Sequence, residues 1–194
     1  MRISGSLICA IAAFGFASVS IGPALSATHD RSAQQALATM TLSLNEAASA
    51  AQKTTGGMPV HVVFKDQGGS GIPQEGIRSE PTGKLTYTVI TIKDGALTQS
   101  NVDGLTGQVS PGKPLSKADI TPDNQGVIIA AQQPPKVSLQ QATAAAEEKA
   151  RGRAIQSSLT TRDGKAACEI DVVAEAGGVT EVVVDPASGT VTVK

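Results

Sequence analysis

The sequence has 194 residues, with 16 basic and 17 acidic side chains and no tryptophan. Such a near-neutral balance lacks the excess of Lys and Arg that binding to nucleic-acid phosphates requires. A chain of this length forms one ordinary domain or two small ones.

Residues 1–27 have the pattern of a cleaved export signal. Arg2 supplies the one charge of this segment, and an apolar stretch from Leu7 to Val19 is followed by a Gly-Pro break and small residues. These are the parts of a secretory signal, whereas a membrane anchor needs roughly 20 apolar residues in a row. We therefore expect cleavage between Ala27 and Thr28, a periplasmic or secreted protein, and no membrane span after cleavage.

Removal of the signal leaves a chain that is poor in aromatic and sulfur side chains. Phe64 and Tyr87 are then the aromatic residues that remain, and Cys168 is the one cysteine. No intramolecular disulfide is possible, so Cys168 is either buried or links a partner. Its strand-like surroundings favour burial, because cysteine then behaves as a small apolar residue.

Two segments share the same signals for the start and end of a helix. Ser43 and Ser138 each follow an apolar residue and precede a Glu or Gln by three positions, and Ala-rich runs come next. This pattern is a capping box, in which the Ser side chain and the Glu or Gln side chain each bond the other residue's amide. Gly57 and Gly152 stand at the same offset from the serines, and we expect them to end each helix with a positive φ angle.

Extended sequence follows each helix in the same order. Asp163-Gly164 and Asp94-Gly95 are hairpin signals, and Asp185 to Gly189 repeats the Asp-x-x-x-Gly pattern of Asp103 to Gly107. The strands that we predict are residues 60–65 and 85–93 in the first copy, and 153–161, 165–174, 180–184 and 190–193 in the second.

These signals divide the chain into five parts. They are a signal peptide (1–27), an N-terminal segment (28–40), a first repeat (41–110) with a Gly-rich loop insertion (66–83), a Pro-rich linker (111–136) and a second repeat (137–194).

The second repeat resembles a PepSY domain. The resemblance is carried by Val137 to Ala142 at the start of the helix, Gly152 at its end, the hairpin at Asp163-Gly164, and the closing run from Val182 to Val191. It implies an α+β fold in which a helix packs on a small antiparallel sheet, twice over, since residues 41–110 resemble the family more weakly. It also implies a non-catalytic role in binding or restraining a partner, with peptidase inhibition as the usual proposal for the family.

The histidines offer little chemistry. His61 lies opposite Val60 and Val62 in a strand, so we expect a solvent-facing side chain, and no cysteine accompanies it as a metal ligand. No Gly-x-Ser-x-Gly elbow is present for a serine hydrolase. If cleavage fell after Ser26, His29 would stand third and, with the free amine, would suit square-planar Cu(II) or Ni(II).

Three other motifs have simpler interpretations as structural elements. Gly68 to Gly71 lacks the Gly-Lys-Ser/Thr ending of a phosphate loop, which favours a flexible hairpin loop. Asp103 and Asp185 lack the neighbouring acids of a calcium cage, which favours turn formation. No residue set therefore predicts a catalytic, cofactor or metal site.

We expect an exported, non-catalytic binding module that restrains or inhibits a peptidase or another envelope partner, an unidentified protein or peptide. The edge strand Thr190 to Val193 or the loop Asp66 to Gly83 is the expected contact surface. The alternative is a structural protein of the cell envelope that self-associates through strand edges or Cys168. An enzyme is the least favoured class, because no group of residues fits the roles that catalysis requires.

Overall fold

The computed structural model describes residues 38–66, 85–116, 119, 135–175 and 177–194. In chain order the elements are α2 (Leu44–Thr55), β1 (Met58–Asp66), β2 (Leu85–Lys93), β3 (Ala96–Asp103), β4 (Lys113–Pro114), α4 (Leu139–Ala150), β5 (Gly152–Arg162), β6 (Lys165–Ala174), β7 (Val179–Val184) and β8 (Val191–Val193). The predicted export signal, His29 and the Gly-rich stretch from Gly68 to Gly71 lie outside the described residues.

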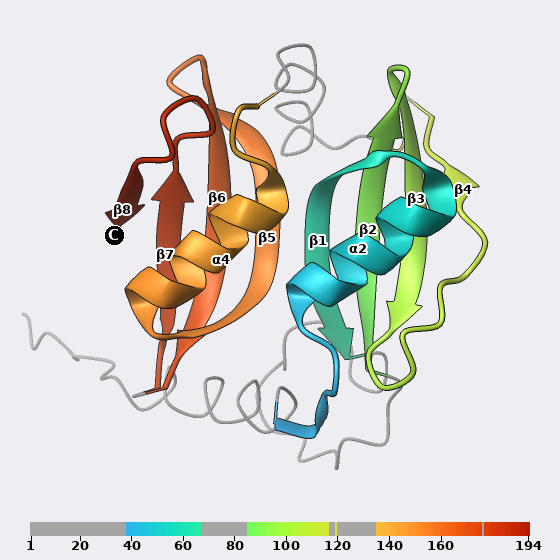
Figure 1. Cartoon of the computed structure of the whole chain (residues 1–194), viewed down its shortest axis with the longest axis horizontal. Coiled ribbons are helices and arrows are strands. Elements are labelled where there is room, and N and C mark those ends of the chain that lie inside the picture. The colour runs from blue at the N-terminus through green and yellow to red at the C-terminus, as the bar shows by residue number, and fades with distance from the viewer. Residues whose placement is uncertain (1–37, 67–84, 117–118, 120–134, 176) are drawn as a thin grey trace, which may run out of the picture.

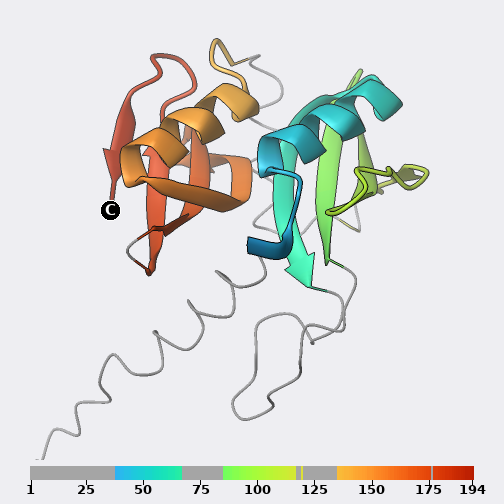
Figure 2. The ribbon, with the colours of Figure 1, turned by 60° about the horizontal axis from the view of Figure 1, so that its bottom comes forward.

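The strands form one antiparallel sheet in the order β4-β3-β2-β1-β5-β6-β7-β8. Both helices lie on the same face of this sheet, α2 over the first half and α4 over the second (Figures 1 and 2). We call the other face the open face. The α+β prediction is confirmed, but the two small sheets that were expected are joined into one. The segment Lys113–Pro114, which falls in the predicted linker, belongs to the sheet as β4.

The two halves meet at a seam between β1 and β5. His61 pairs with Ser158, Val62 with Ser157, and Val63 with Gln156. Counted from the two capping serines, Val62 and Ser157 occupy matching positions, and so do His61 and Gln156. At the centre of the seam, Val62 therefore pairs with its own counterpart, Ser157. The residue before this position in each strand pairs with the residue after it in the other strand. This is the pairing of a two-fold symmetric interface.

Both predicted capping boxes are present. Ser43 accepts a hydrogen bond from the amide of Glu46 at 3.2 Å, and the Glu46 carboxylate accepts one from the Ser43 amide at 2.7 Å. The matching bonds between Ser138 and Gln141 are 3.2 and 2.9 Å long. Each box satisfies amide groups that the first helical turn leaves without a partner.

The helix ends differ from the prediction. The residues with positive φ are Gly56 (φ 68°) and Arg151 (φ 51°), each one position before the glycine expected in this role. Gly57 and Gly152 are needed for another reason, because a neighbouring strand passes close to them. A Cβ atom on Gly57 would lie 2.9 Å from the Ile92 carbonyl oxygen, and one on Gly152 would lie 2.1 Å from that of Val173.

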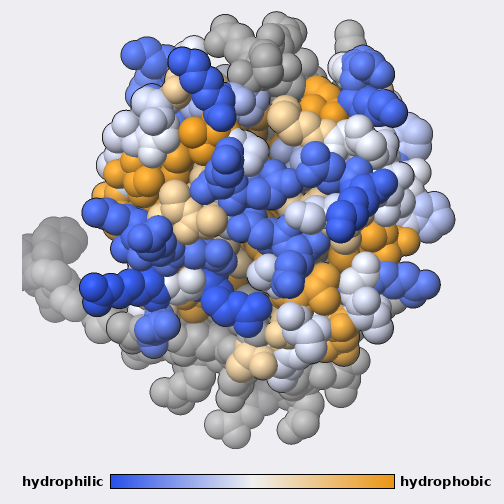
Figure 3. Space-filling model, viewed as in Figure 1, coloured by the Kyte–Doolittle hydropathy of each residue, from blue (hydrophilic) through white to orange (hydrophobic). Residues whose placement is uncertain are grey.

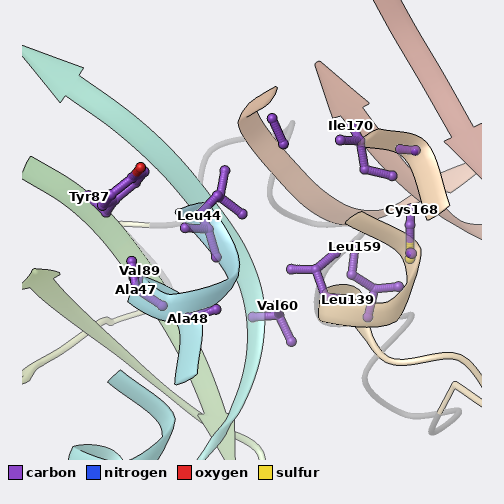
Figure 4. Packing of buried hydrophobic residues seen from close by; sticks show 14 of the residues in the cluster. Leu44, Ala47, Ala48, Val60, Tyr87, Val89, Leu139, Leu159, Cys168 and Ile170 are labelled. Atoms are coloured by element: carbon purple, nitrogen blue, oxygen red, sulfur yellow. The ribbon is translucent and has the colours of Figure 1, made fainter. Parts of the chain in front are cut away.

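The core lies between the helices and the sheet, and it is almost entirely aliphatic (Figure 4). Small residues line the buried side of each helix, among them Ala47 and Ala142, which bring the helices close to the strands. Tyr87 is the one large polar side chain among the fully buried ones, and its hydroxyl donates to the Leu42 carbonyl at 2.8 Å. Burial raises the pKa of Tyr87 to about 12.

Candidate functional site

Strand β8 forms one edge of the sheet. It pairs with β7 through Val191, Thr192 and Val193, and α4 packs against it on the helix face. The tight turn that brings the chain to this edge begins at Asp185, whose carboxylate accepts bonds from the Ala187 amide and the Ser188 hydroxyl, both at 2.8 Å. These bonds lower the pKa of Asp185, the backbone bond most of all, so the turn interpretation of this aspartate accounts for its contacts.

The backbone of β8 has polar groups that face away from the sheet. The Asp185 amide donates to Thr190 O, and the Lys194 amide donates to Glu181 O. Since alternate residues of an antiparallel strand bond the same neighbour, Thr192 also faces β7, and the N–H and C=O groups of Val191 and Val193 point outward. No hydrogen bond to these outward groups is present among the described residues.

Apolar side chains accompany this edge. Val193 is 43% exposed on the helix face, and Val191 packs partly on the core. Figure 3 shows hydrophobic surface at the margin where β8 and α4 lie, next to the polar outer sides of the helices. An edge with free backbone groups and exposed valines suits the addition of another strand.

Charged side chains lie beside β8 on the open face. Lys194 and Arg162 both contact Glu181, at 2.8 and 3.2 Å, and Arg162 also lies 3.4 Å from Glu169. All four side chains are more than a third exposed. Such exposed pairs contribute little stability, and they place alternating charges on the polar side of the edge.

The opposite edge of the sheet, strand β4, offers fewer backbone groups to an added strand. Strand β4 has two residues, of which Pro114 has no amide hydrogen. Short edges that contain proline resist the addition of further strands. The two ends of the sheet therefore differ, and β8 is the better candidate for binding.

His61 lies at the seam and is more buried than predicted. Its side chain is on the open face, as its alternation with Val62 indicated, but it is only partly exposed, and its Nδ1 lies 2.5 Å from the Ser158 Oγ. Burial, with a smaller contribution from Lys65, lowers the pKa of His61 to about 4. The expected solvent-facing histidine is instead a neutral contact between the halves. The sequence pattern could not indicate this, because it does not predict that β5 covers this position.

Cys168 is fully buried in β6, as its sequence setting predicted. Burial, with a smaller effect of Asp185, raises the pKa of its thiol to about 12. A thiol of this kind is inert, since the thiolate is the reactive form.

The remaining sequence predictions concern the Asp103 turn, the cleavage site, metal binding and membrane spans. Asp103 accepts bonds from the amides of Leu105 and Thr106 at 3.1 and 3.0 Å, as expected for a turn. Ala27 and Thr28, the predicted cleavage site, lie outside the described residues. Within the described part of the chain, no cluster of three His, Cys, Asp or Glu side chains forms a metal site, and no helix is long and apolar enough to cross a membrane.

Comparisons with known proteins bear mainly on the second half. No curated protein matches the chain in sequence. A crystal structure of a "putative lipoprotein" from Clostridium difficile 630 is 19% identical, with 80% of this chain and 93% of that chain covered and a TM-score of 0.41. Residues 136–192 match the family model described as "Peptidase propeptide and YPEB domain", PepSY. Membership of residues 41–110 in the same family stays a prediction. A PepSY domain is thus detected at residues 136–192 of this chain.

Proposed function

We propose that the protein is an exported binding module that holds an extended segment of a partner protein along β8. The observation that carries this proposal is the free backbone of Val191 and Val193 at the edge of the sheet. An added strand bonds such groups along its whole length, and its alternate side chains reach the two faces of the sheet. On one face they meet α4 and Val193, and on the other the charged side chains around Glu181.

The finer role that we propose is restraint or inhibition of an envelope peptidase. The description of the family as a peptidase propeptide supports this role. The predicted signal peptide supports export.

Proline substitution at β8 tests the proposal. Because the Val191 amide points outward, Val191→Pro removes an N–H that an added strand needs and leaves the ladder with β7 intact. Immobilised mature protein is incubated with an envelope extract from its source, and both the captured proteins and the peptidase activity left in the extract are measured.

We expect the wild type to capture a partner and to lower peptidase activity. Val191→Pro is expected to reduce both effects about tenfold, as the loss of a backbone hydrogen bond predicts. Thr192→Ser is the control, because it leaves every backbone group of the strand in place. Equal capture by the wild type and Val191→Pro would contradict binding at this edge.

Self-association in the envelope is the second candidate function. The β1–β5 seam supports it, because there two similar halves already join strand edge to strand edge. In this case the occupant of β8 is a second copy, and sedimentation velocity of purified mature protein would give a dimer that Val191→Pro converts to monomer. The version that uses a Cys168 disulfide loses its support, since that thiol is fully buried.

A further inference from the structure

A recess of about 350 Å³ opens on the open face of the first half. Its lining residues come from β2, from the end of β3, and from the segment that follows the Asp103 turn: Thr86, Asn101, Asp103, Gln108, Val109, Ser110 and Pro111. Its volume lies at the low end of the range of small-molecule pockets, ~300–1,000 Å³. The recess is far along the sheet from β8, so it is distinct from the proposed partner edge.

An irregularity in the edge strand forms this recess. Val109 pairs with Val102 by a single bridge, and the Ser110 amide donates to Asn101 O at 2.8 Å. In a regular antiparallel pair the Asn101 amide would donate to the Ser110 backbone oxygen. Here it donates to the Ser110 hydroxyl instead, at 2.9 Å. Regular pairing resumes at Lys113. Ser110 and Pro111 therefore leave the regular path of a strand beside β3.

A buried hydroxyl without a partner lies in this recess. Thr86 is 4% exposed, and its Oγ1 makes no hydrogen bond. Its side chain is on the open face, since the neighbouring Tyr87 points toward the helices. Leaving a buried hydroxyl unsatisfied is unfavourable, so the orphaned group points to a ligand that completes it.

The lining selects the chemistry of that ligand. Asn101 uses its Oδ1 to accept from Thr88, which leaves its NH₂ group for a ligand, and the Gln108 amide and the Ser110 hydroxyl add donors and acceptors. No Lys or Arg lines the recess to hold an anion. Asp103 is its one acid, and a cation cage needs more oxygens of that kind. Val109 and Pro111 are its only apolar members, which disfavours an apolar ligand.

We propose that this recess binds a neutral polyhydroxylated ligand, either a free sugar or a sugar unit of a glycan chain. Hydroxyl groups donate and accept at once, so they match the mixed lining and complete the bonding of Thr86. The second half lacks this chemistry. The register places Ala167 and Val183 where the first half has Thr86 and Asn101, and a regular β8 takes the place of the irregular segment.

The test is an ¹⁵N–¹H NMR titration of the mature protein with glucose, N-acetylglucosamine, a short glycan of the same unit, and N-acetylglycine amide as a peptide-like probe. We expect saturable shift changes at Thr86, Asn101 and Gln108 with the sugars. Tighter binding of the glycan than of the free sugar identifies a chain as the source, and equal binding identifies the free sugar. Changes confined to the peptide-like probe, or no changes at all, overturn the proposal.

Two variants separate binding from folding. Thr86→Val removes the orphaned hydroxyl and keeps the shape of the side chain, so we expect about tenfold weaker sugar binding together with an unchanged or higher melting temperature. A lower melting temperature shows that the hydroxyl serves the fold, and it overturns the proposal. Ala167→Thr, the matched control in the second half, is expected to leave sugar binding unchanged. Loss of binding in this control also overturns the proposal.

Discussion

The two halves of the molecule share their order of elements and differ in what fills the shared positions. Counted along the paired strands, buried Tyr87 of the first half corresponds to Cys168 of the second. The first capping box has the ionisable Glu46 where the second has Gln141. Both halves keep the helix cap, the crowded glycine and the Asp turn.

The crowded glycines give the largest expected difference between the halves. A Cβ at position 152 would lie 2.1 Å from the Val173 oxygen, against 2.9 Å for position 57 and Ile92. We expect Gly152→Ala to lower the free energy of unfolding by about 3 kcal/mol and Gly57→Ala by about 1–2 kcal/mol. Urea denaturation of both variants measures this. Equal losses would show that the two close approaches are equivalent.

Protonation of the seam is the next largest effect. His61 has a pKa of about 4 in the folded protein and the ordinary value of 6.5 when unfolded. As the pH falls, His61 is therefore protonated in the unfolded chain at a higher pH than in the folded protein. The free energy of unfolding is highest above pH 6.5 and falls as the pH drops toward 4. The loss is at most about 3 kcal/mol. His61→Gln, which installs the residue of the matching position Gln156, is expected to remove this part of the pH dependence.

Unfolding curves between pH 7.5 and 4 check this expectation. A wild-type slope that His61→Gln leaves unchanged would contradict it.

The capping boxes give the smallest effect. Ser43→Ala and Ser138→Ala are each expected to cost about 1 kcal/mol of stability. The boxes differ in their response to acid, because Glu46 is ionisable and Gln141 is not. Hydrogen bonds from Ser43 lower the pKa of Glu46. The stabilisation from Glu46 is present above its unfolded pKa and is lost as the pH falls through the lower folded value.

The exchange Glu46→Gln with Gln141→Glu is expected to move this acid sensitivity to the second helix. Circular dichroism of helix content between pH 5 and 2 follows it. Unchanged acid sensitivity in Glu46→Gln would locate the effect elsewhere.

Local sequence signals predicted much of this fold. The capping boxes, the Asp-Gly hairpins and the alternation of β6 depend on residues close together in the chain, and the structure contains all of them. One predicted parallel between the halves does not hold in the structure. Asp94-Gly95 joins β2 to β3, whereas Asp163-Gly164 joins β5 to β6, so the two hairpins are not equivalent.

Features that depend on distant contacts were not predictable in the same way. The β1–β5 seam joins residues almost 100 positions apart, and no local pattern indicates which strand edges meet. The burial of His61 follows from that seam. The recess at Thr86 was also missed, because it requires the irregular backbone at Ser110. A threonine paired with Asp103 across two strands otherwise gives an ordinary polar face.

The seam has a consequence for the order in which the chain folds. β5 and β6 pair over ten positions and are joined by a two-residue turn, whereas β1 and β5 pair over three. Closing a short loop costs less entropy than closing a long one, and long-range pairs form late. We therefore expect each half to collapse on its own helix first. The eight-stranded sheet would then be completed by docking, and the seam would be the first contact to open under stress.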